Sequence, residues 1–466
     1  MFLFTGCSTK GEPGFGGEGD APTSASTDTA QATTPAARPN ILLIIADDVG
    51  IDQSGLYQDV TGLDDRDYAS TPTLDEVCQR GVRFEQAWAQ PTCLPTRGNL
   101  ITGRYGFRTG LLSAGNSQTI SPDEVTLPTV LSEEAGYRTA SVGKWHLGTE
   151  EELGGVEAPN TMGWGHYSGN LQGEITDYWR WRRTTDGVQT EDTRYATTAQ
   201  VDDALAWLRE NQQDQQDQQD QGEPWLLWMG FNSPHIPIHL PPAALHDNPE
   251  LDDDPDTISQ DPAPYFRAML ESLDAEVGRL LSELEATGEL EDTVILYLGD
   301  NGTDSKVSQP ESLRSGPKGT LNQGGVWVPM CAAGPGLPGG VSSGALVHAV
   351  DLFATALELG GVDISALPAE VGRDSRSLGP LLRDPSAAHR DHLYAETDLQ
   401  RGRVGGVTVR GERYKLIVED DGAEFLYDLS EDLWEERDLI DQRTDDAALQ
   451  AAYDELKGVI EALHGG

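Results

Sequence analysis

The stretch that most constrains the fold is Asn40-Ile41-Leu42-Leu43-Ile44-Ile45-Ala46-Asp47-Asp48. Its centre, residues 41–46, is short, wholly apolar and rich in β-branched side chains, which is typical of a strand buried on both faces of a parallel sheet. Residues 225–229 and 294–298 have the same character. We therefore expect three core strands in one sheet.

Helical patterns separate these runs and continue after them. Helices are predicted over residues 73–80, from just after Pro95 to about 102, and over 197–210, 262–284 and 350–359, with a further strand at 137–142. Strands that alternate with helices are typical of an α/β protein whose mostly parallel central sheet is flanked by helices. The Gln-Gln-Asp run that ends at Gln221 is interpreted as a solvated loop or helix extension without a chemical role.

The pattern changes after about residue 390. Short apolar runs alternate there with turn residues, and residues 445–463 have the spacing of a closing helix. We therefore predict a main α/β domain over 39–388 and a smaller C-terminal α+β subdomain with an antiparallel sheet over 389–466.

The N-terminal residues 1–38 have a different composition. Met1-Phe2-Leu3-Phe4-Thr5-Gly6-Cys7 resembles the end of a bacterial lipoprotein leader, although the charged start and apolar stretch of a full signal are missing. Residues 10–38 are rich in Gly, Ser, Thr, Ala and Pro, which is typical of a flexible tether. We expect a protein of the bacterial cell envelope or a secreted one (periplasm or outer-membrane lipoprotein), with Cys7 as the candidate point of lipid attachment.

The charge balance is strongly acidic. The 466 residues carry 78 acidic and 32 basic side chains, a formal net charge of −46. Such a chain lacks the basic footprint of a nucleic-acid-binding protein. Four cysteines are too few for a disulfide scaffold. A bridge between Cys78 and Cys331 is left open.

Polar pairs follow two of the predicted core strands, Asp47-Asp48 after the first and Asp300-Asn301 after the third. In open α/β sheets, ligands bind beyond the carboxyl ends of the strands. Three carboxylates and one amide oxygen there favour Ca²⁺ or Mg²⁺ over zinc. Each pair alone is more typical of a turn after a strand, so the metal interpretation depends on what accompanies it.

The accompanying motif is Cys93-Leu94-Pro95-Thr96-Arg97. An isolated cysteine is usually a small core residue. Here Pro95 suits the first turn of a helix, which places Cys93 at a helix N-terminus where anionic species are favoured. Arg97 lies one turn further on, where it can hold an anion.

The motif resembles the signature of the type I, formylglycine-dependent sulfatases, arylsulfatase-like members of the alkaline phosphatase superfamily. Other stretches resemble family motifs in the family's order: 40–48, Gly143-Lys144-Trp145-His146-Leu147-Gly148, Pro234-His235-Ile236-Pro237, Gly299-Asp300-Asn301-Gly302, Lys318-Gly319-Thr320 before Gly324-Gly325, and Arg410-Gly411-Glu412-Arg413-Tyr414-Lys415-Leu416. The resemblance covers about residues 39–440. It implies hydrolysis of sulfate esters, and a maturation enzyme, the formylglycine-generating enzyme, that oxidises Cys93.

The resemblance also implies site residues. One Ca²⁺ would be bound by Asp47, Asp48, Cys93 (as formylglycine), Asp300 and Asn301. The catalytic residues would be Cys93, Arg97, Lys144, His146, His235 and Lys318. A hydroxyl of the hydrated aldehyde would attack sulfur, and His235 or Lys318 would help the alcohol leave. His146 would then take the proton of the second hydroxyl as sulfate is expelled.

Two alternatives to a sulfatase are weighed. One is a phosphate or phosphonate ester hydrolase of the same superfamily, and the other is a non-catalytic protein that binds sulfated ligands if Cys93 stays unmodified. The substrate, a sulfated small molecule or glycan, is left open, with pocket walls expected from residues 149–195 and 236–262. For Tyr178-Trp179-Arg180-Trp181, stacking on a ring and packing within the protein both stay open.

The match departs from the family at two positions. Gln323 and Trp327 stand where Glu and Arg are usual. We expect different local ion pairing there, and a pocket wall of different shape.

Overall fold

The computed structural model describes residues 38–114, 118–148, 155–218, 222–398 and 404–465. Within it, the chain from Arg38 onward forms one compact unit. The predicted lipid attachment at Cys7 and the predicted tether lie outside the described residues, and the predicted domain boundary near residue 388 stays a prediction. In the part of the chain that is described, no helix is long and apolar enough to cross a membrane.

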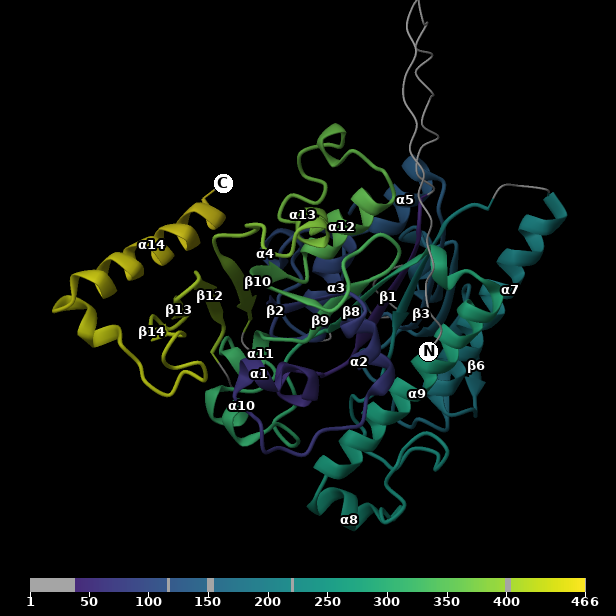
Figure 1. Ribbon diagram of the computed structural model, residues 1–466, viewed down its shortest axis with the longest axis horizontal. Coiled ribbons are helices and arrows are strands. Elements are labelled where there is room, and N and C mark those ends of the chain that lie inside the picture. Colours follow the sequence, from purple (N-terminus) through teal and green to yellow (C-terminus); the bar gives the residue numbers. More distant parts are fainter. Residues whose placement is uncertain (1–37, 115–117, 149–154, 219–221, 399–403, 466) are drawn as a thin grey trace, which may run out of the picture. The chain divides into compact units, whose positions relative to one another are not determined.

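A ten-stranded mixed sheet forms the centre of the fold (Figure 1). Its order is β10-β2-β9-β8-β1-β7-β3-β4-β5-β6. The strands are β1 (Asn40–Ala46), β2 (Val82–Trp88), β3 (Arg138–Lys144), β4 (His166–Asn170), β5 (Trp181–Thr185), β6 (Val188–Asp192), β7 (Trp225–Gly230), β8 (Thr293–Gly299), β9 (Met330–Ala333) and β10 (Val341–His348). Strands β8, β1, β7, β3 and β4 run parallel, as predicted for a buried sheet core.

Helices cover both faces of this sheet. The helices of this part of the chain are α1 (Gln58–Thr61), α2 (Pro72–Gln79), α3 (Cys93–Thr102), α4 (Gly106–Thr109), α5 (Leu127–Ala135), α6 (Ala158–Thr161), α7 (Ala196–Gln218), α8 (Pro255–Gln260), α9 (Ala263–Thr287), α10 (Pro310–Ser315), α11 (Gln323–Val326), α12 (Asp351–Leu359) and α13 (Gly379–Arg383), and the longer ones pack on the sheet. Figure 1 shows α7 and α9 on one side of the sheet and α5 and α12 on the other.

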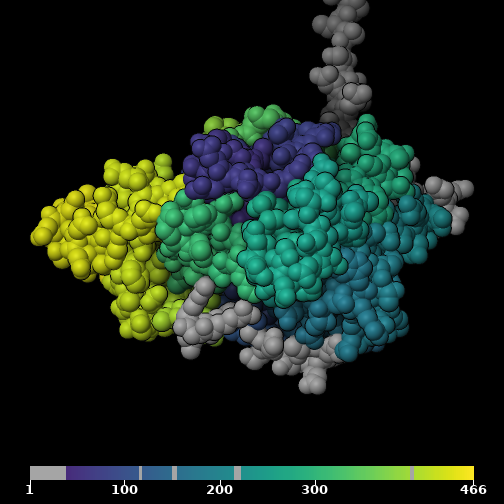
Figure 2. Space-filling model, turned by 90° about the horizontal axis from the view of Figure 1, so that it is seen from below, coloured from purple at the N-terminus to yellow at the C-terminus, as the bar shows by residue number. Residues whose placement is uncertain are grey.

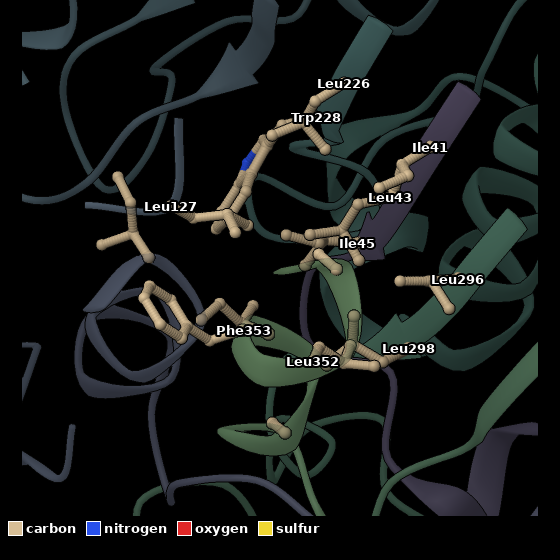
Figure 3. Close-up of a cluster of buried hydrophobic side chains, with 14 of the residues drawn as sticks. Ile41, Leu43, Ile45, Leu127, Leu226, Trp228, Leu296, Leu298, Leu352 and Phe353 are labelled. Atoms are coloured by element: carbon tan, nitrogen blue, oxygen red, sulfur yellow. The ribbon is translucent and has the colours of Figure 1, made fainter. Parts of the chain in front are cut away.

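The alternation of side chains along β1 explains the two faces. Ile41, Leu43 and Ile45 enter one buried cluster, with residues of α3, α5 and α12 (Figure 3). The side chains between them enter the opposite cluster, with residues of α2, α7 and α9. Successive side chains of a strand point to opposite faces, so a strand covered on both sides must be apolar throughout.

A second, antiparallel sheet lies in the C-terminal part of the chain. It consists of β11 (Leu393–Thr397), β12 (Gly406–Arg410), β13 (Tyr414–Glu419) and β14 (Glu424–Asp428), in that order. Helix α14 (Ala447–His464) packs on it through Leu449 and Leu456. These C-terminal residues, yellow in Figure 2, gather on one side of the visible surface. The predicted α/β fold with a smaller antiparallel unit is confirmed.

Three local features differ from the predictions or complete them. Helix α3 begins at Cys93 and not after Pro95, because the first-turn N–H groups lack helical partners and a proline costs little there. Helix α7 continues to Gln218, so the first part of the Gln-Gln-Asp run extends the helix. Cys78 and Cys331 form a disulfide between α2 and β9, which the sequence left open.

Candidate active site

The candidate residues lie where several core elements end. Asp47 and Asp48 follow β1, while Asp300 and Asn301 follow β8. These strands are parallel neighbours with Ala46 opposite Gly299, so the two polar pairs emerge side by side. Lys144 ends β3, on the other side of β7 from β1. Parallel strands bring their carboxyl ends to one edge, which explains how distant sequence motifs meet.

The acidic residues form a buried, internally bonded cluster. Asp47, Asp48, Asp300 and Asn301 are each at most 1% exposed. The backbone N–H of Asp48 donates to Oδ1 of Asp300 at 3.1 Å, and Nδ2 of Asn301 donates to Oδ1 of Asp48 at 2.9 Å. Asp48 has a φ of +68°, an uncommon conformation for a residue other than glycine, and it places its carboxylate within the cluster.

Each carboxylate of the cluster has a cationic partner. Nζ of Lys144 lies 2.5 Å from Oδ2 of Asp47, and Nη2 of Arg97 lies 3.1 Å from Oδ2 of Asp300. Lys318 donates to Asp48. Buried charges are tolerated only when paired, so the three cations balance the three carboxylates of this set.

The surroundings shift the pKa values of the three carboxyl groups in different directions. Burial raises the pKa of Asp47, against the effect of Lys144, and it raises that of Asp300 to about 6 with help from neighbouring Asp47. Burial acts the same way on Asp48, but Lys318 and His235 outweigh it and hold the pKa of Asp48 well below its usual range. Asp48 is therefore the most firmly ionised of the three.

The cluster has unused oxygen ligands. Among the described residues, Oδ1 of Asp47 and Oδ1 of Asn301 have no hydrogen-bond partner although both atoms are buried. Ligand atoms of Asp47, Cys93 and Asp300 lie within 4.8 Å of one another, as do those of Asp47, Asp48 and His235. An unpartnered buried acceptor is costly, so this arrangement fits a bound cation.

Cys93 is the first residue of α3 and is 1% exposed. It is the only cysteine of the described residues outside the disulfide. Burial raises the pKa of its thiol, against the effects of Lys144 and Lys318. A buried, protonated thiol is a poor nucleophile.

Two histidines lie close to Cys93. His146 has a φ of +54°, and burial together with Lys144 and Arg97 lowers its pKa. Nδ1 of His235 lies 2.9 Å from the carbonyl oxygen of Ile236, and burial lowers the pKa of His235 to about 4. Neutral imidazoles keep a free lone pair, so both side chains can accept protons near neutral pH.

A cavity of about 440 Å³, here called the inner cavity, opens onto the cluster. Its wall includes Asp48, Cys93, His146, His235 and Lys318. Arg97 and Lys144 are fully buried behind it. The structure therefore brings all the predicted residues together, with some in contact with the cavity and others supporting them.

Part of the cavity wall was not found from the sequence. Gln172, Gly173 and Glu174 come from the expected range 149–195, whereas Asp304 and Ser305 were not predicted. Their position just after the Asp300-Asn301 pair is the only sequence signal for them. Gly173 lies so close to His146 that a Cβ atom would be 2.3 Å from its Nε2.

The two departures from the family pattern lie away from this cavity. Nε1 of Trp88 donates to Oε1 of Gln323 at 3.0 Å, and Trp327 packs against Trp434. The buried ion pair in this region joins Lys415 and Glu435 at 2.5 Å, and Glu435 also accepts from the backbone N–H of Gln323. Neither Gln323 nor Trp327 is among the described residues that line the inner cavity, so an effect of these two positions on the pocket wall stays a prediction.

The Trp-rich stretch is mainly packed within the protein. Tyr178 and Trp181 are at most 3% exposed. Trp179 is 39% exposed and packs against Tyr195 and His239, with ring centroids 5.1 and 4.9 Å away. Its exposed part does not line the inner cavity.

Comparisons with known proteins agree on one family. The family model described as Sulfatase matches residues 39–362. Arylsulfatase G of Rattus norvegicus is 28% identical over 438 residues, covering 84% of this chain and 77% of that protein. A sulfatase of Formosa agariphila is 28% identical over an alignment of 503 residues, covering 89% and 87%.

Solved structures show the same fold. Ps i-CgsB has a TM-score of 0.73 at 24% identity, covering 90% of this chain and 92% of that one, and it has also been solved in complex with k-i-k-neocarrahexaose. A protein solved with its substrate D-glucosamine-2-N,6-O-disulfate has a TM-score of 0.70 at 21% identity, covering 91% and 97%. The family match spans well over half of the chain, so the chain belongs to the sulfatase family of the alkaline phosphatase superfamily and is a sulfuric ester hydrolase.

Proposed function

We propose that the chain hydrolyses sulfate esters with a formylglycine made from Cys93 and a bound Ca²⁺, releasing sulfate and an alcohol or phenol. The observation that carries this proposal is the position of Cys93 in the wall of the inner cavity, with its ligand atom within 4.8 Å of those of Asp47 and Asp300. This geometry supports a nucleophile precursor beside a cation in one substrate cavity.

Asp47, Asp48, Asp300 and Asn301 would hold the cation, together with an oxygen on residue 93. All donors are then oxygens, and this ligand set favours Ca²⁺ or Mg²⁺ over softer metals. The larger, more flexible coordination of Ca²⁺ suits a site with four protein side chains from two loops. When bound, the ion supplies Lewis-acid chemistry: it makes a hydroxyl more acidic and stabilises negative charge.

The side chains around residue 93 have separable roles. Arg97 donates hydrogen bonds to Asp300 and to the carbonyl oxygen of Lys144. Its guanidinium therefore keeps one position behind the cavity and provides a positive charge there. Lys144 likewise keeps positive charge beside Asp47. Fixed positive charge that needs no reorganisation stabilises an anion as it forms.

Lys318 and His235 line the cavity itself. Lys318 is a charged donor that can bind sulfate and protonate the departing oxygen. Because Nδ1 of His235 faces the carbonyl oxygen of Ile236, a neutral His235 carries its proton on Nδ1 and turns Nε2 toward Asp48 and the cavity. His146, neutral and partly exposed in the same cavity, is placed to accept a proton from residue 93.

The substrate is proposed to be a sulfated small molecule or glycan. The named relatives include an arylsulfatase, and the structural neighbours include one protein solved with k-i-k-neocarrahexaose and one solved with D-glucosamine-2-N,6-O-disulfate. The formylglycine-generating enzyme is the partner that this proposal requires during maturation.

Parallel assays test the reaction. The protein is coexpressed with a formylglycine-generating enzyme and incubated with an aryl sulfate and the matching aryl phosphate. We expect sulfate release to dominate, and Cys93→Ala to show none. Preference for the phosphate would overturn the sulfatase proposal in favour of a phosphohydrolase.

Mass spectrometry of the peptide with residue 93 tests the modification separately. The aldehyde should be present when the maturation enzyme is coexpressed, and activity should scale with the converted fraction. Full activity in a preparation that contains only the thiol would overturn the formylglycine part of the proposal.

A further inference from the structure

One side chain in the wall of the inner cavity has no role in the reaction proposed above. Thr92 directly precedes Cys93 and is 3% exposed, and it lines the cavity together with Cys93 and Lys318. Its Oγ1 is buried and has no hydrogen-bond partner among the described residues. An unsatisfied buried hydroxyl costs free energy in the folded state. This cost is removed if a molecule bound in the cavity supplies the missing partner.

The position of Pro95 explains why this hydroxyl is unpartnered. Thr92 is the N-cap residue of α3, and an N-cap hydroxyl normally accepts a hydrogen bond from the backbone N–H of the second or third helical residue. The third helical residue is Pro95, which has no N–H. The side chain of Thr92 accordingly makes no capping bond. The proline of the Cys93–Arg97 motif thus leaves the hydroxyl available to a ligand.

A backbone hydrogen bond places Thr92 beside Lys318. The N–H of Gly319 donates to the carbonyl oxygen of Pro91 at 2.8 Å, so the two chain segments meet directly next to Thr92 and Lys318. Both of these side chains line the same cavity. Lys318 brings positive charge, and the N-terminus of α3 adds the partial positive charge of the helix. An anion in the cavity therefore meets favourable charge at the place where Thr92 lies.

The rest of the cavity wall offers an anion few buried donors. A sulfate group presents oxygen atoms that only accept hydrogen bonds, whereas much of the wall is itself made of acceptors. Its carboxylates are those of Asp48, Glu174 and Asp304. Among the hydroxyl and amide side chains of the wall, those of Gln172 and Ser305 are exposed to solvent, and that of Thr92 is buried. A hydrogen bond to a charged group is stronger where water is excluded, so Thr92 is the effective neutral donor.

From these observations we propose that Thr92 is a further catalytic residue, whose hydroxyl donates a hydrogen bond to an oxygen of the sulfate group in the inner cavity. This inference rests on the proposed function, because it assumes that the sulfate group occupies this cavity. Rotation about the single Cα–Cβ bond exchanges the hydroxyl and methyl positions of a threonine, so the hydroxyl can turn toward the ligand. The contact is made to sulfate and requires no particular alcohol.

Two substitutions at this position test the hydroxyl. Thr92→Val replaces the hydroxyl by a methyl group of similar size, and Thr92→Ser keeps the hydroxyl. Thr293→Val is the matched control, because Thr293 is similarly buried but begins β8, at the opposite end of the strand from Asp300. The variants and the unaltered protein are coexpressed with the formylglycine-generating enzyme. Each rate with an aryl sulfate is divided by the converted fraction that mass spectrometry gives for residue 93.

We expect Thr92→Val to lower kcat/KM at least about tenfold, because a donor to the negative charge of the reacting group is lost. Thr92→Ser should stay within about threefold of the unaltered protein, since it can make the same hydrogen bond. Thr293→Val should match the unaltered protein. An unchanged kcat/KM in Thr92→Val, or an equally large loss in Thr92→Ser, would overturn the inference.

Sulfate binding separates this inference from the proposed reaction. Cys93→Ala is titrated calorimetrically with inorganic sulfate in the presence of Ca²⁺, alone and combined with Thr92→Val or Thr293→Val. We expect Thr92→Val to raise the Kd for sulfate at least about fivefold and Thr293→Val to leave it unchanged. This result supports the contact even if the unaltered protein hydrolyses no sulfate ester, which would count against the proposed function alone. Sulfate release by the unaltered protein, with equal Kd values in the two combined variants, would retain the reaction and overturn the contact of Thr92.

Discussion

Nζ of Lys144 lies 2.5 Å from Oδ2 of Asp47, and both side chains are completely buried. Lys144 ends β3 and Asp47 follows β1, so the pair spans the intervening strand β7. The ion pair thereby ties two motifs that are far apart in the sequence into one site. Removing either partner leaves an uncompensated buried charge.

The first prediction concerns this ion pair. Lys144→Met should lower the free energy of unfolding by roughly 3–5 kcal/mol, because Asp47 stays buried without its cation. Lys457→Met removes a lysine from the more exposed pair with Glu424 and should cost about 1 kcal/mol or less. Urea denaturation in a chelator checks both values. If both variants lost equally little free energy of unfolding, Lys144 would not be needed to neutralise buried Asp47.

The second prediction concerns the cation. Ca²⁺ should raise the midpoint of thermal unfolding, since a ligand at 100 times its Kd stabilises by about 2.7 kcal/mol. Asp47→Asn should lose most of this response. Asp274→Asn is the matched control, because Asp274 is equally buried but caps α2 by accepting from the backbone of Thr73 and Leu74. A calcium response in Asp47→Asn as large as in the unaltered protein would contradict this assignment.

The third prediction concerns the nucleophile precursor. Cys93→Ala should reduce kcat by at least about a thousandfold, as is usual when a nucleophile is removed. The fold should persist, because the substitution removes only one buried sulfur atom and leaves the backbone and the neighbouring side chains unchanged. Ser305→Ala, in the same cavity wall but outside the predicted set, should change kcat little. Sulfate release by Cys93→Ala at a rate near that of the unaltered enzyme would exclude residue 93 as the nucleophile.

The fourth prediction concerns Gly173. A Cβ atom there would lie 2.3 Å from Nε2 of His146, so Gly173→Ala must displace the imidazole. We expect kcat to fall at least about tenfold, because misplacing a proton acceptor removes its contribution. Gly458→Ala, in α14 with open space around its Cβ position, should keep full activity and gain about 0.5–1 kcal/mol of stability. An unchanged kcat in Gly173→Ala would show that the position of His146 does not limit the reaction.

The fifth prediction concerns pH and Glu396. Burial raises the pKa of this carboxyl to about 7, against hydrogen bonds from Phe107 and Tyr394. The folded state thus keeps a proton that the unfolded chain releases near pH 4.5. The contribution of Glu396 to the free energy of unfolding is therefore fully present below about pH 4.5, and it is lost as the pH rises through about 7.

Glu396→Gln should flatten this fall and be more stable than the unaltered protein at pH 8, by an amount of order 1–3 kcal/mol. Urea denaturation at pH 5, 6, 7 and 8 measures the difference. Glu455→Gln, at an exposed position, leaves Glu396 in place and should keep the fall in stability of the unaltered protein. Parallel curves for Glu396→Gln and the unaltered protein would contradict the raised pKa.

Local sequence was sufficient for the core strands and for the polar pairs that follow them. A short run that is apolar at every position is typical of a strand inside a parallel sheet. The polar residues that follow such a run lie at the end of the strand, where solvent or a ligand can contact them. The predicted strands at 41–46, 225–229 and 294–298 correspond to β1, β7 and β8. Cys93 and Arg97 were identifiable because they belong to one contiguous five-residue run that resembles a family signature.

Tertiary structure decided the features that depend on distant contacts. The β5–β6 hairpin, the approach of Gly173 to His146 and the place of Asp304 in the cavity wall have no periodic signal, because each is set by packing against other elements. The start of α3 at Cys93 was also missed, since a proline within the first turn is compatible with more than one helix start. The sequence by itself determined which groups are available for chemistry. Only the folded chain determined their pairing, their burial and the shape of the inner cavity, because these come from contacts between residues that lie on different elements, far apart in the sequence.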